Sequence, residues 1–205
     1  MRDIDKALTD IGEIRNRIAA GTAFRGYGPL AVGATGLVGL ATALAQTIWL
    51  PHPETNPVAF VSGWLGAAVF SAIIVFIEMQ GRSRRFHSSL ADTMIHQAME
   101  QFMPATAASI ALPLLLLRVA PDAVWVMPGL WQLFVCLGLF ASVRTLPRGM
   151  SLVGGWYFLS AFSCLMLASS THSLSPWFMG APFLIGQSLM AAVLYFAAGE
   201  GDGEI

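Results

Sequence analysis

Apolar residues are gathered into six stretches that are separated by short polar links. Five of the stretches are each about 20 residues long, enough to cross a hydrocarbon core of about 30 Å as an α-helix. The third stretch is shorter and carries two prolines. The pattern predicts an all-α, polytopic membrane helix bundle with spans at residues 29–50, 58–79, 102–117, 124–143, 150–169 and 178–198.

Two polar segments outside the spans have helical periodicity. In residues 3–20, isoleucines recur every seven residues among charges of alternating sign. Residues 82–101 place apolar side chains on one half of a helix and lead directly into the third span. We therefore expect an amphipathic cytoplasmic helix within residues 1–28, a second amphipathic helix before span three, a transmembrane domain at 29–198 and a cytoplasmic tail at 199–205.

Positive charges lie almost entirely on one side of the six spans. Ten of the eleven lysines and arginines precede span one or follow spans two and four, and Arg118 alone lies on the other side. Links that are rich in lysine and arginine stay in the cytoplasm. The sequence therefore predicts a multi-pass protein of the bacterial inner membrane with both termini in the cytoplasm.

Composition and charge limit the classes of partner that this chain is expected to have. The chain is 56% hydrophobic and 11% charged, whereas soluble domains have about 25% charged residues, so lipid is expected to cover the apolar surface. The formal net charge of −1, without a basic stripe, argues against nucleic acid as a partner. Residues 3–20 are predicted to pack on the protein's own bundle, on a second copy or on a cytoplasmic protein. The alternative is a helix that lies on the lipid surface.

The charged candidate site lies just before the third span. Asp92, His96 and Glu100 follow one another at intervals of four on one side of the predicted helix, and Glu78 lies at the end of span two. Two carboxylates and an imidazole are ligands for a divalent metal, or a proton relay if they face a cavity. The alternative, which we favour, is that this stripe is the solvated face of an interfacial helix.

Polar residues inside the spans are few. The notable amides are Gln46, Gln132 and Gln187, and such side chains usually form hydrogen bonds across helices. Gln132 and Gln187 are also candidates to bind a ligand or ion. Small residues recur at every fourth position in the first two spans, which predicts that both spans are central: Ala31, Thr35, Gly39 and Ala43, then Gly63, Ala67 and Ser71.

Short matches between the two halves of the chain suggest an internal repeat. The residues around Trp64 recur around Trp156, and those around Met103 recur around Met179. Because each half would hold three spans, the two halves would be inverted, as they are in many transporters. The alternative is chance similarity, since membrane segments use few residue types.

The C-terminal half also carries several short motifs. They are Gly129-Leu130-Trp131-Gln132, Leu146-Pro147, Trp156-Tyr157, the run from Ser175 to Phe183, and Gly186-Gln187. Together they resemble a family of bacterial six-span inner-membrane proteins for which no function is known. The resemblance implies a membrane location and brings no activity, cofactor or site residues with it.

Three functions remain open. The favoured one is a helix bundle that binds or passes a small solute or ion, in line with inverted halves. The second is a membrane-embedded regulatory or scaffold protein that acts through its cytoplasmic amphipathic helices. The third is a membrane metalloenzyme that uses Asp92, His96 and Glu100. An enzyme is least favoured because the sequence has no nucleophile elbow, P-loop, Rossmann loop or haem-attachment motif, and no motif implies a cofactor.

Overall fold

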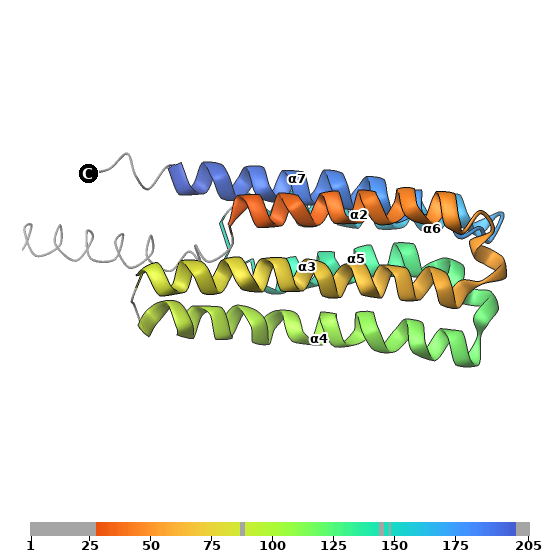
Figure 1. Cartoon of the computed structure of the whole chain (residues 1–205), viewed down its shortest axis with the longest axis horizontal. Coiled ribbons are helices and arrows are strands. Elements are labelled where there is room, and N and C mark those ends of the chain that lie inside the picture. Colours follow the sequence, from red (N-terminus) through yellow and green to blue (C-terminus); the bar gives the residue numbers. More distant parts are fainter. Residues whose placement is uncertain (1–27, 87–88, 144–145, 148, 200–205) are drawn as a thin grey trace, which may run out of the picture.

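The fold consists of helices throughout the part of the chain that the structure describes. The computed structural model describes residues 28–86, 89–143, 146–147 and 149–199, without the side chains of 82–99 and 198–199. Six of its helices are long and apolar enough to span a membrane, which confirms the predicted fold class. They are α2 (Pro29–Trp49), α3 (Pro57–Phe86), α4 (Ser89–Val119), α5 (Met127–Ala141), α6 (Met150–Ser169) and α7 (Trp177–Gly199) (Figure 1).

The third span is part of a longer helix than its apolar stretch suggests. Residues 89–101 of the predicted amphipathic segment and residues 102–117 form one continuous helix, α4, whereas residues 82–86 of that segment belong to α3. Pro104 and Pro113 both lie inside α4 without ending it. The 31 residues of α4 exceed the roughly 20 that a bilayer needs, so the amphipathic segment supplies the length that the short stretch lacks.

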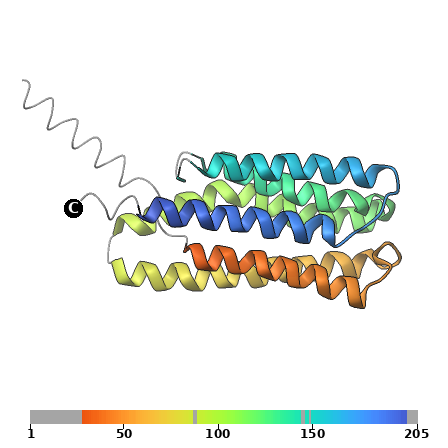
Figure 2. The same cartoon turned by 90° about the horizontal axis from the view of Figure 1, so that it is seen from above.

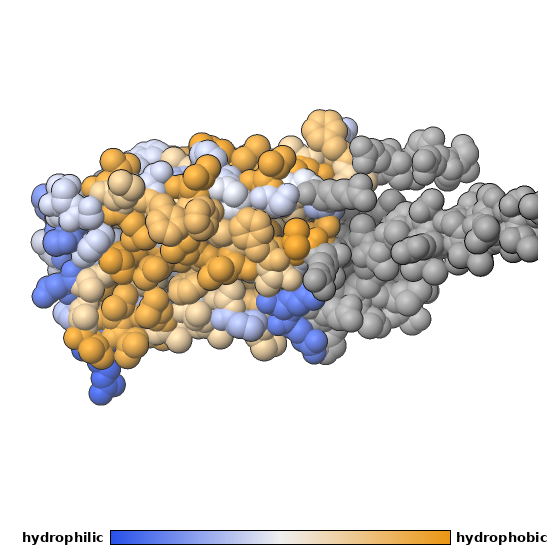
Figure 3. Space-filling view, turned by 180° about the vertical axis from the view of Figure 1, so that it is seen from behind, coloured by the Kyte–Doolittle hydropathy of each residue, from blue (hydrophilic) through white to orange (hydrophobic). Residues whose placement is uncertain are grey.

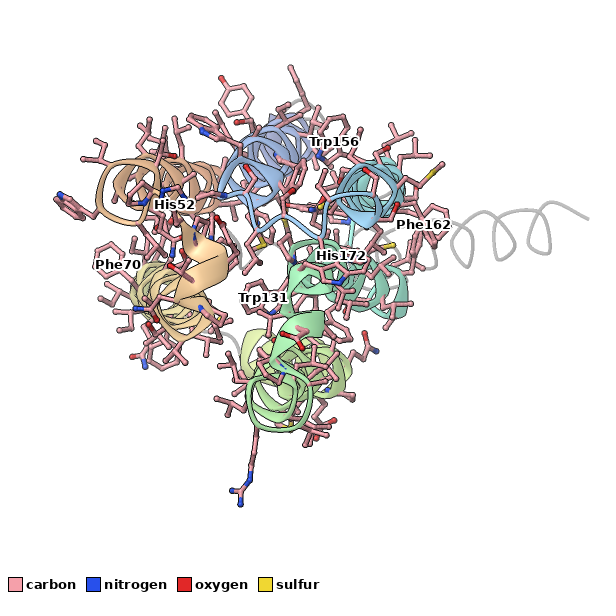
Figure 4. The ribbon with its side chains drawn as sticks, turned by 90° about the vertical axis from the view of Figure 1, so that its right-hand side faces the viewer. His52, Phe70, Trp131, Trp156, Phe162 and His172 are labelled. Atoms are coloured by element: carbon pink, nitrogen blue, oxygen red, sulfur yellow. The ribbon has the colours of Figure 1, made fainter. Side chains whose placement is uncertain are left out.

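The six helices stand side by side in a ring (Figures 1 and 2). Going around it, the order is α2, α7, α6, α5, α4 and α3, and α3 closes the ring on α2 (Figure 4). The short helices η1 (Pro53–Thr55) and η2 (Pro121–Val126) and the α6–α7 link lie at one end, which we call the short-link end. The start of α2 and the end of α7 lie at the other end, which we call the terminal end.

The ring order is incompatible with the inverted repeat that the sequence suggested. That repeat would exchange α2 with α5, α3 with α6 and α4 with α7. The two helices of each pair lie on opposite sides of the ring, so exchanging them leaves the order of the helices around the ring unchanged. Inverted halves are related by a two-fold axis in the membrane plane, and that axis would reverse the order of the helices. Met103 and Met179, which the repeat would superpose, are 61% and 3% exposed. The helix order therefore argues against inverted halves, which leaves chance similarity as the alternative interpretation of the short matches.

Helices α2 and α7 form the most extensive helix–helix contact in the bundle, and small residues allow their close approach. Gly36 and Gly39 of α2 let α7 approach so closely that added Cβ atoms would lie 3.0 Å from Gln187 Cβ and 3.4 Å from Phe183 Cβ. At Gly180 of α7, an added Cβ would overlap the Cβ of Ala43. The stripe of small residues predicted in the first span therefore does form a helix contact.

The second span is less central than predicted. Only 17% of the α3 span is buried, whereas half of the span that contains α5 is buried. Gly63 lies against the side chain of Gln46, but Gly66 has open space around it. Helix α5 contacts α4, α6 and α7, and its span is the most buried of the six, so α5 is more central than α3.

Apolar side chains fill the interior and cover the outside of the bundle. One buried cluster lies toward the short-link end and includes Phe60, Trp64, Met127, Trp131 and Met179. A second cluster, centred on α5, α6 and α7, includes Tyr157 and Cys136. Figure 3 shows apolar residues over most of one outer face. Since this surface would be unfavourable in water, it indicates contact with the lipid bilayer.

An aromatic contact ties two links together at the short-link end. The rings of Trp125, in η2, and His172, in the α6–α7 link, pack together at a tilt of 39° with centroids 4.7 Å apart; His172 is labelled in Figure 4. His172 is the one non-glycine residue of the described chain with a positive φ, 51°, a conformation that costs about 1–2 kcal/mol. This ring contact and the hydrogen bond from the His172 N–H to the Ala168 carbonyl (2.7 Å) stabilise that turn.

The predicted orientation in the membrane has a direct test. Glu54→Cys and Ser173→Cys, both at the short-link end, are expected to react with a membrane-impermeant maleimide added to intact cells. Gln80→Cys, toward the terminal end, is expected to react only after the membrane is opened, because the arginine-rich links at that end predict a cytoplasmic location. The native Cys136 and Cys164 are buried and serve as unreactive controls. Labelling of Gln80→Cys alone in intact cells would show that the orientation is the reverse of the predicted one.

Candidate functional site

The charged stripe before the third span is only partly described. Glu100 is exposed on α4, as expected for a stripe that faces outward. Asp92 and His96 belong to the helical backbone of α4, but their side chains lie outside the described residues. Among the residues that are described, no three His, Cys, Asp or Glu side chains gather closely enough to hold a metal ion.

Glu78 lies against the start of another helix. Its carboxylate occupies the space beside Gly28, where an added Cβ would overlap it. Gly28 is the residue that precedes the first turn of α2. The free N–H groups of a helix start favour a neighbouring negative charge. The described contacts thus connect Glu78 with α2.

The exposed position of Glu100 predicts a silent substitution. Glu100→Gln is expected to leave the thermal midpoint of the purified protein unchanged within about 2 °C, because exposed charges contribute little to stability. Differential scanning fluorimetry in detergent, with and without zinc or manganese, measures this. A marked fall in the midpoint, or loss of a metal-dependent rise seen in the parent protein, would support the inward, metal-binding orientation instead.

The two glutamines predicted to bind a ligand lie in different parts of the bundle. Gln132 donates a hydrogen bond to the Phe178 carbonyl, and Gln187 lies nine residues further along α7, about 13 Å away along the helix. The Gln187 amide faces the hydroxyl of Tyr157 instead, without reaching regular hydrogen-bond geometry. The structure therefore does not bring Gln132 and Gln187 into one site.

Gln132 donates a hydrogen bond to a carbonyl of α7 that a proline leaves without its helical donor. In an α-helix the Phe178 carbonyl would accept a hydrogen bond from the N–H of residue 182, but residue 182 is a proline and has no N–H. The Gln132 Nε2 donates to that carbonyl at 2.8 Å and to the Pro128 carbonyl at 3.0 Å. Gln132 is completely buried, so its amide replaces a hydrogen bond that water cannot supply.

The preceding residue, Trp131, does the same for α4. Pro113 leaves the Ser109 carbonyl without its helical donor, and the indole Nε1 of Trp131 donates to that carbonyl at 2.8 Å. Figure 4 shows Trp131 within the ring of helices. Two adjacent residues of α5 thus satisfy the carbonyls freed by two prolines, one in α4 and one in α7.

Gln46 joins α2 to α3. Its Nε2 donates to the Phe60 carbonyl at 3.0 Å, and a Cβ at Gly63 would lie 2.5 Å from the same nitrogen. Glycine at this position therefore lets the amide reach the backbone of α3. The sequence singled out Gln46 as an amide but not as a site residue.

Trp64 is a buried residue that the sequence did not single out as a site residue. Its ring packs against Phe60 and against Phe183, with centroids 6.5 Å apart in both cases. A Cβ at Gly39 would lie 4.0 Å from Trp64 Cζ3, so the edge of the indole opposite its nitrogen faces α2. The sequence signal is a tryptophan directly after Gly63, a residue of the small-residue stripe.

Three buried polar atoms around the short-link cluster have no hydrogen-bond partner among the described residues. They are the Oε1 atoms of Gln46 and Gln132 and the Nε1 of Trp64. The three side chains, which we call the amide–indole set, are 8%, 0% and 5% exposed. Buried polar groups without partners are rare in native proteins, so each of these atoms needs an explanation.

The two amides of the set lie at a similar depth in the bundle. Ala43 faces Gly180 across the α2–α7 contact, and Gln46 is one helical turn nearer the short-link end. Gln132 is bonded to Phe178, which is two residues nearer that end than Gly180. Trp64 follows Phe60, the residue bonded to Gln46, by one helical turn of α3.

Comparisons of the chain with protein-family models, with curated proteins and with solved structures find no match. The resemblance of the C-terminal half to a family of six-span inner-membrane proteins therefore stays a prediction. The case for function depends on the geometry of the bundle itself.

Proposed function

We propose that this membrane protein binds a small solute inside the short-link half of its helix bundle, as a step in passing or sensing that solute. The observation that carries the proposal is the amide–indole set, whose three buried polar atoms lack partners. An unsatisfied buried group costs about 1–3 kcal/mol. A molecule that enters the bundle and bonds to these atoms removes that cost, which is a source of affinity.

The orientation of the Gln132 amide supports a preformed binding group. Its nitrogen donates to two carbonyls; the opposite orientation would place the amide oxygen against carbonyl oxygens, and none of these atoms can donate. The position of Oε1 is therefore fixed by the hydrogen bonds of the nitrogen. A binding group that is held in place before the ligand arrives loses little entropy when it binds.

The other functions have less support in the described residues. The scaffold function depends on residues 3–20, which lie outside the description. The metalloenzyme depends on Asp92 and His96, whose side chains are also outside it. The bacterial inner membrane and cytoplasmic termini stay predictions, which the labelling experiment above tests.

Substituted-cysteine accessibility tests whether small molecules reach the set. Gln46→Cys protein in nanodiscs is treated with methyl methanethiosulfonate, a small neutral thiol reagent, and modification is followed by mass spectrometry. The thiol introduced by Gln46→Cys is expected to react at least about tenfold faster than the native Cys136 and Cys164, because reactivity follows access. The two native cysteines are buried in apolar surroundings and are internal controls. Equally slow reaction at all three positions would contradict the proposed function.

A further inference from the structure

The six helices of the bundle pack as two units. Among the described residues, the most extensive contacts join α2 to α7, α5 to α6, α4 to α5 and α2 to α3. These contacts define a first unit of α2, α3 and α7 and a second unit of α4, α5 and α6. The units meet where α7 faces α6 and α5 and where α3 faces α4, and each of these contacts is less extensive. We call this boundary the seam.

Two side-chain hydrogen bonds cross the seam, and both end on the first turns of α7. Gln132 of α5 donates to the Phe178 carbonyl at 2.8 Å. Trp156 of α6 donates through its indole Nε1 to the Pro182 carbonyl at 3.0 Å, and Figure 4 shows Trp156 beside α7. We call these two hydrogen bonds the seam bonds. They lie toward the short-link end, where α7 begins.

Further along α7 the seam consists of close packing contacts. The ring of Tyr157 packs edge-on against Phe183 with centroids 5.4 Å apart, and it lies so close to Gly186 that an added Cβ would overlap it. Nearer the terminal end, a Cβ added to Gly149 would lie 2.9 Å from Val193 Cγ1. The two units are therefore most tightly packed away from the short-link end.

The chain connections between the units differ at the two ends of the bundle. At the terminal end, α3 ends at Phe86 and α4 begins at Ser89, so a very short connection keeps these helix ends together. At the short-link end, residues 170–176 join α6 to α7 without forming a regular helix. A link of this kind allows its two helices to move apart more readily than a two-residue connection does.

Resting on the proposed function for its purpose, we infer that the two units separate at the short-link end of the seam when the seam bonds break, and that this movement admits the solute to the bundle. The Phe178 carbonyl has no helical donor, because residue 182 is a proline, so closing the seam supplies the hydrogen bond that α7 lacks. Hydrogen bonds between membrane helices are individually weak, so the seam bonds favour the closed bundle without preventing its opening. Movement of one group of helices against another is an established way for membrane bundles to open.

Distances between paired spin labels, measured by double electron–electron resonance in nanodiscs, test this movement. Cysteines at Ile48 and Leu167 place labels across the seam at the short-link end, and cysteines at Val119 and Leu167 place them within the second unit at the same end. Cysteines at Leu30 and Leu152 place labels across the seam at the terminal end. All five side chains are exposed, and each pair joins two helices that are separated by one other helix of the ring. The native cysteines are buried and are expected to stay unlabelled.

Trp156→Phe removes one seam bond and keeps an aromatic ring. It is expected to increase the population of longer Ile48–Leu167 distances about three- to tenfold, the effect of losing one hydrogen bond between membrane helices. The other two label pairs are expected to keep their distances. The matched control is Trp131→Phe, which removes a bond to the Ser109 carbonyl within the second unit and is expected to leave the Ile48–Leu167 distances unchanged.

A second variant tests the other seam bond. Gln132→Leu/Pro182→Ala removes the bond from α5 and gives the Phe178 carbonyl a helical donor in its place. No buried carbonyl loses its partner, so this variant is expected to fold even if Trp156→Phe does not. The same increase in longer Ile48–Leu167 distances is expected.

The outcomes separate this inference from the function on which it rests. Unchanged Ile48–Leu167 distances in both seam variants, or an equal change in Trp131→Phe, would overturn the inference. Longer distances within the second unit would indicate general loosening of the bundle and would also overturn it. An unreactive thiol in Gln46→Cys, in a protein whose units do separate, would instead remove the proposed function and leave the movement itself in place.

Discussion

Gln132→Leu is expected to lower the free energy of unfolding by about 1–3 kcal/mol, because it leaves the Phe178 carbonyl buried without a donor. Leucine has nearly the volume of glutamine, so the loss comes from hydrogen bonding rather than from a cavity. Reversible unfolding in mixed micelles, followed by circular dichroism, measures the change. The size of the effect follows from the position of Gln132, which is fully buried and bonded to two carbonyls.

The proline provides the control for this prediction. Pro182→Ala restores a backbone N–H to the residue that normally bonds the Phe178 carbonyl. In the Gln132→Leu protein it is therefore expected to recover most of the lost stability. Trp131→Phe, which removes the donor to the Ser109 carbonyl, should be rescued by Pro113→Ala and not by Pro182→Ala. Rescue of both variants by either alanine would contradict the pairing of each side chain with one proline.

Sequence reasoning identified the helices but not their partners. Apolar length was enough to define the spans, because a lipid bilayer leaves few alternatives to a helix of that length. It could not order the helices around a ring, since all six spans are apolar enough to face lipid. Four-residue spacing of small residues identified α2 correctly but also selected α3, because the pattern records that a close contact is possible and not that it forms.

The candidate site was predictable in part for a similar reason. Pro113 and Pro182 identify the Ser109 and Phe178 carbonyls as unbonded, because each lies four residues earlier in a helix. This much follows from the sequence alone. That Trp131 and Gln132 supply the two missing donors depends on α5 contacting both α4 and α7, which the sequence alone does not indicate. The short matches could not establish the internal repeat, because matches of common membrane residues carry no information on helix order.

Gly180→Ala is expected to destabilise the bundle by about 1–3 kcal/mol, the usual cost of forcing an extra methyl group into a packed interior. The new Cβ would overlap the Cβ of Ala43, and the Gly39 carbonyl lies 3.6 Å away. Neither is the end of a flexible side chain, so α2 and α7 must separate. The same unfolding measurement applies. Gly66→Ala, a matched change in α3 with open space around it, should be neutral or slightly stabilising, because alanine favours helices over glycine.

Moving the methyl group from one helix to the other completes the test. In Ala43→Gly/Gly180→Ala, the total volume of the contact is unchanged, and the alanine of α7 faces a glycine of α2. If the contact at this level sets the distance between α2 and α7, the double variant regains most of the stability that Gly180→Ala loses, although glycine at position 43 retains its own cost of about 1 kcal/mol in a helix. Additive losses in the two single variants and the double variant would show that the helices do not meet at these residues, and the order of the ring would then have to be revised.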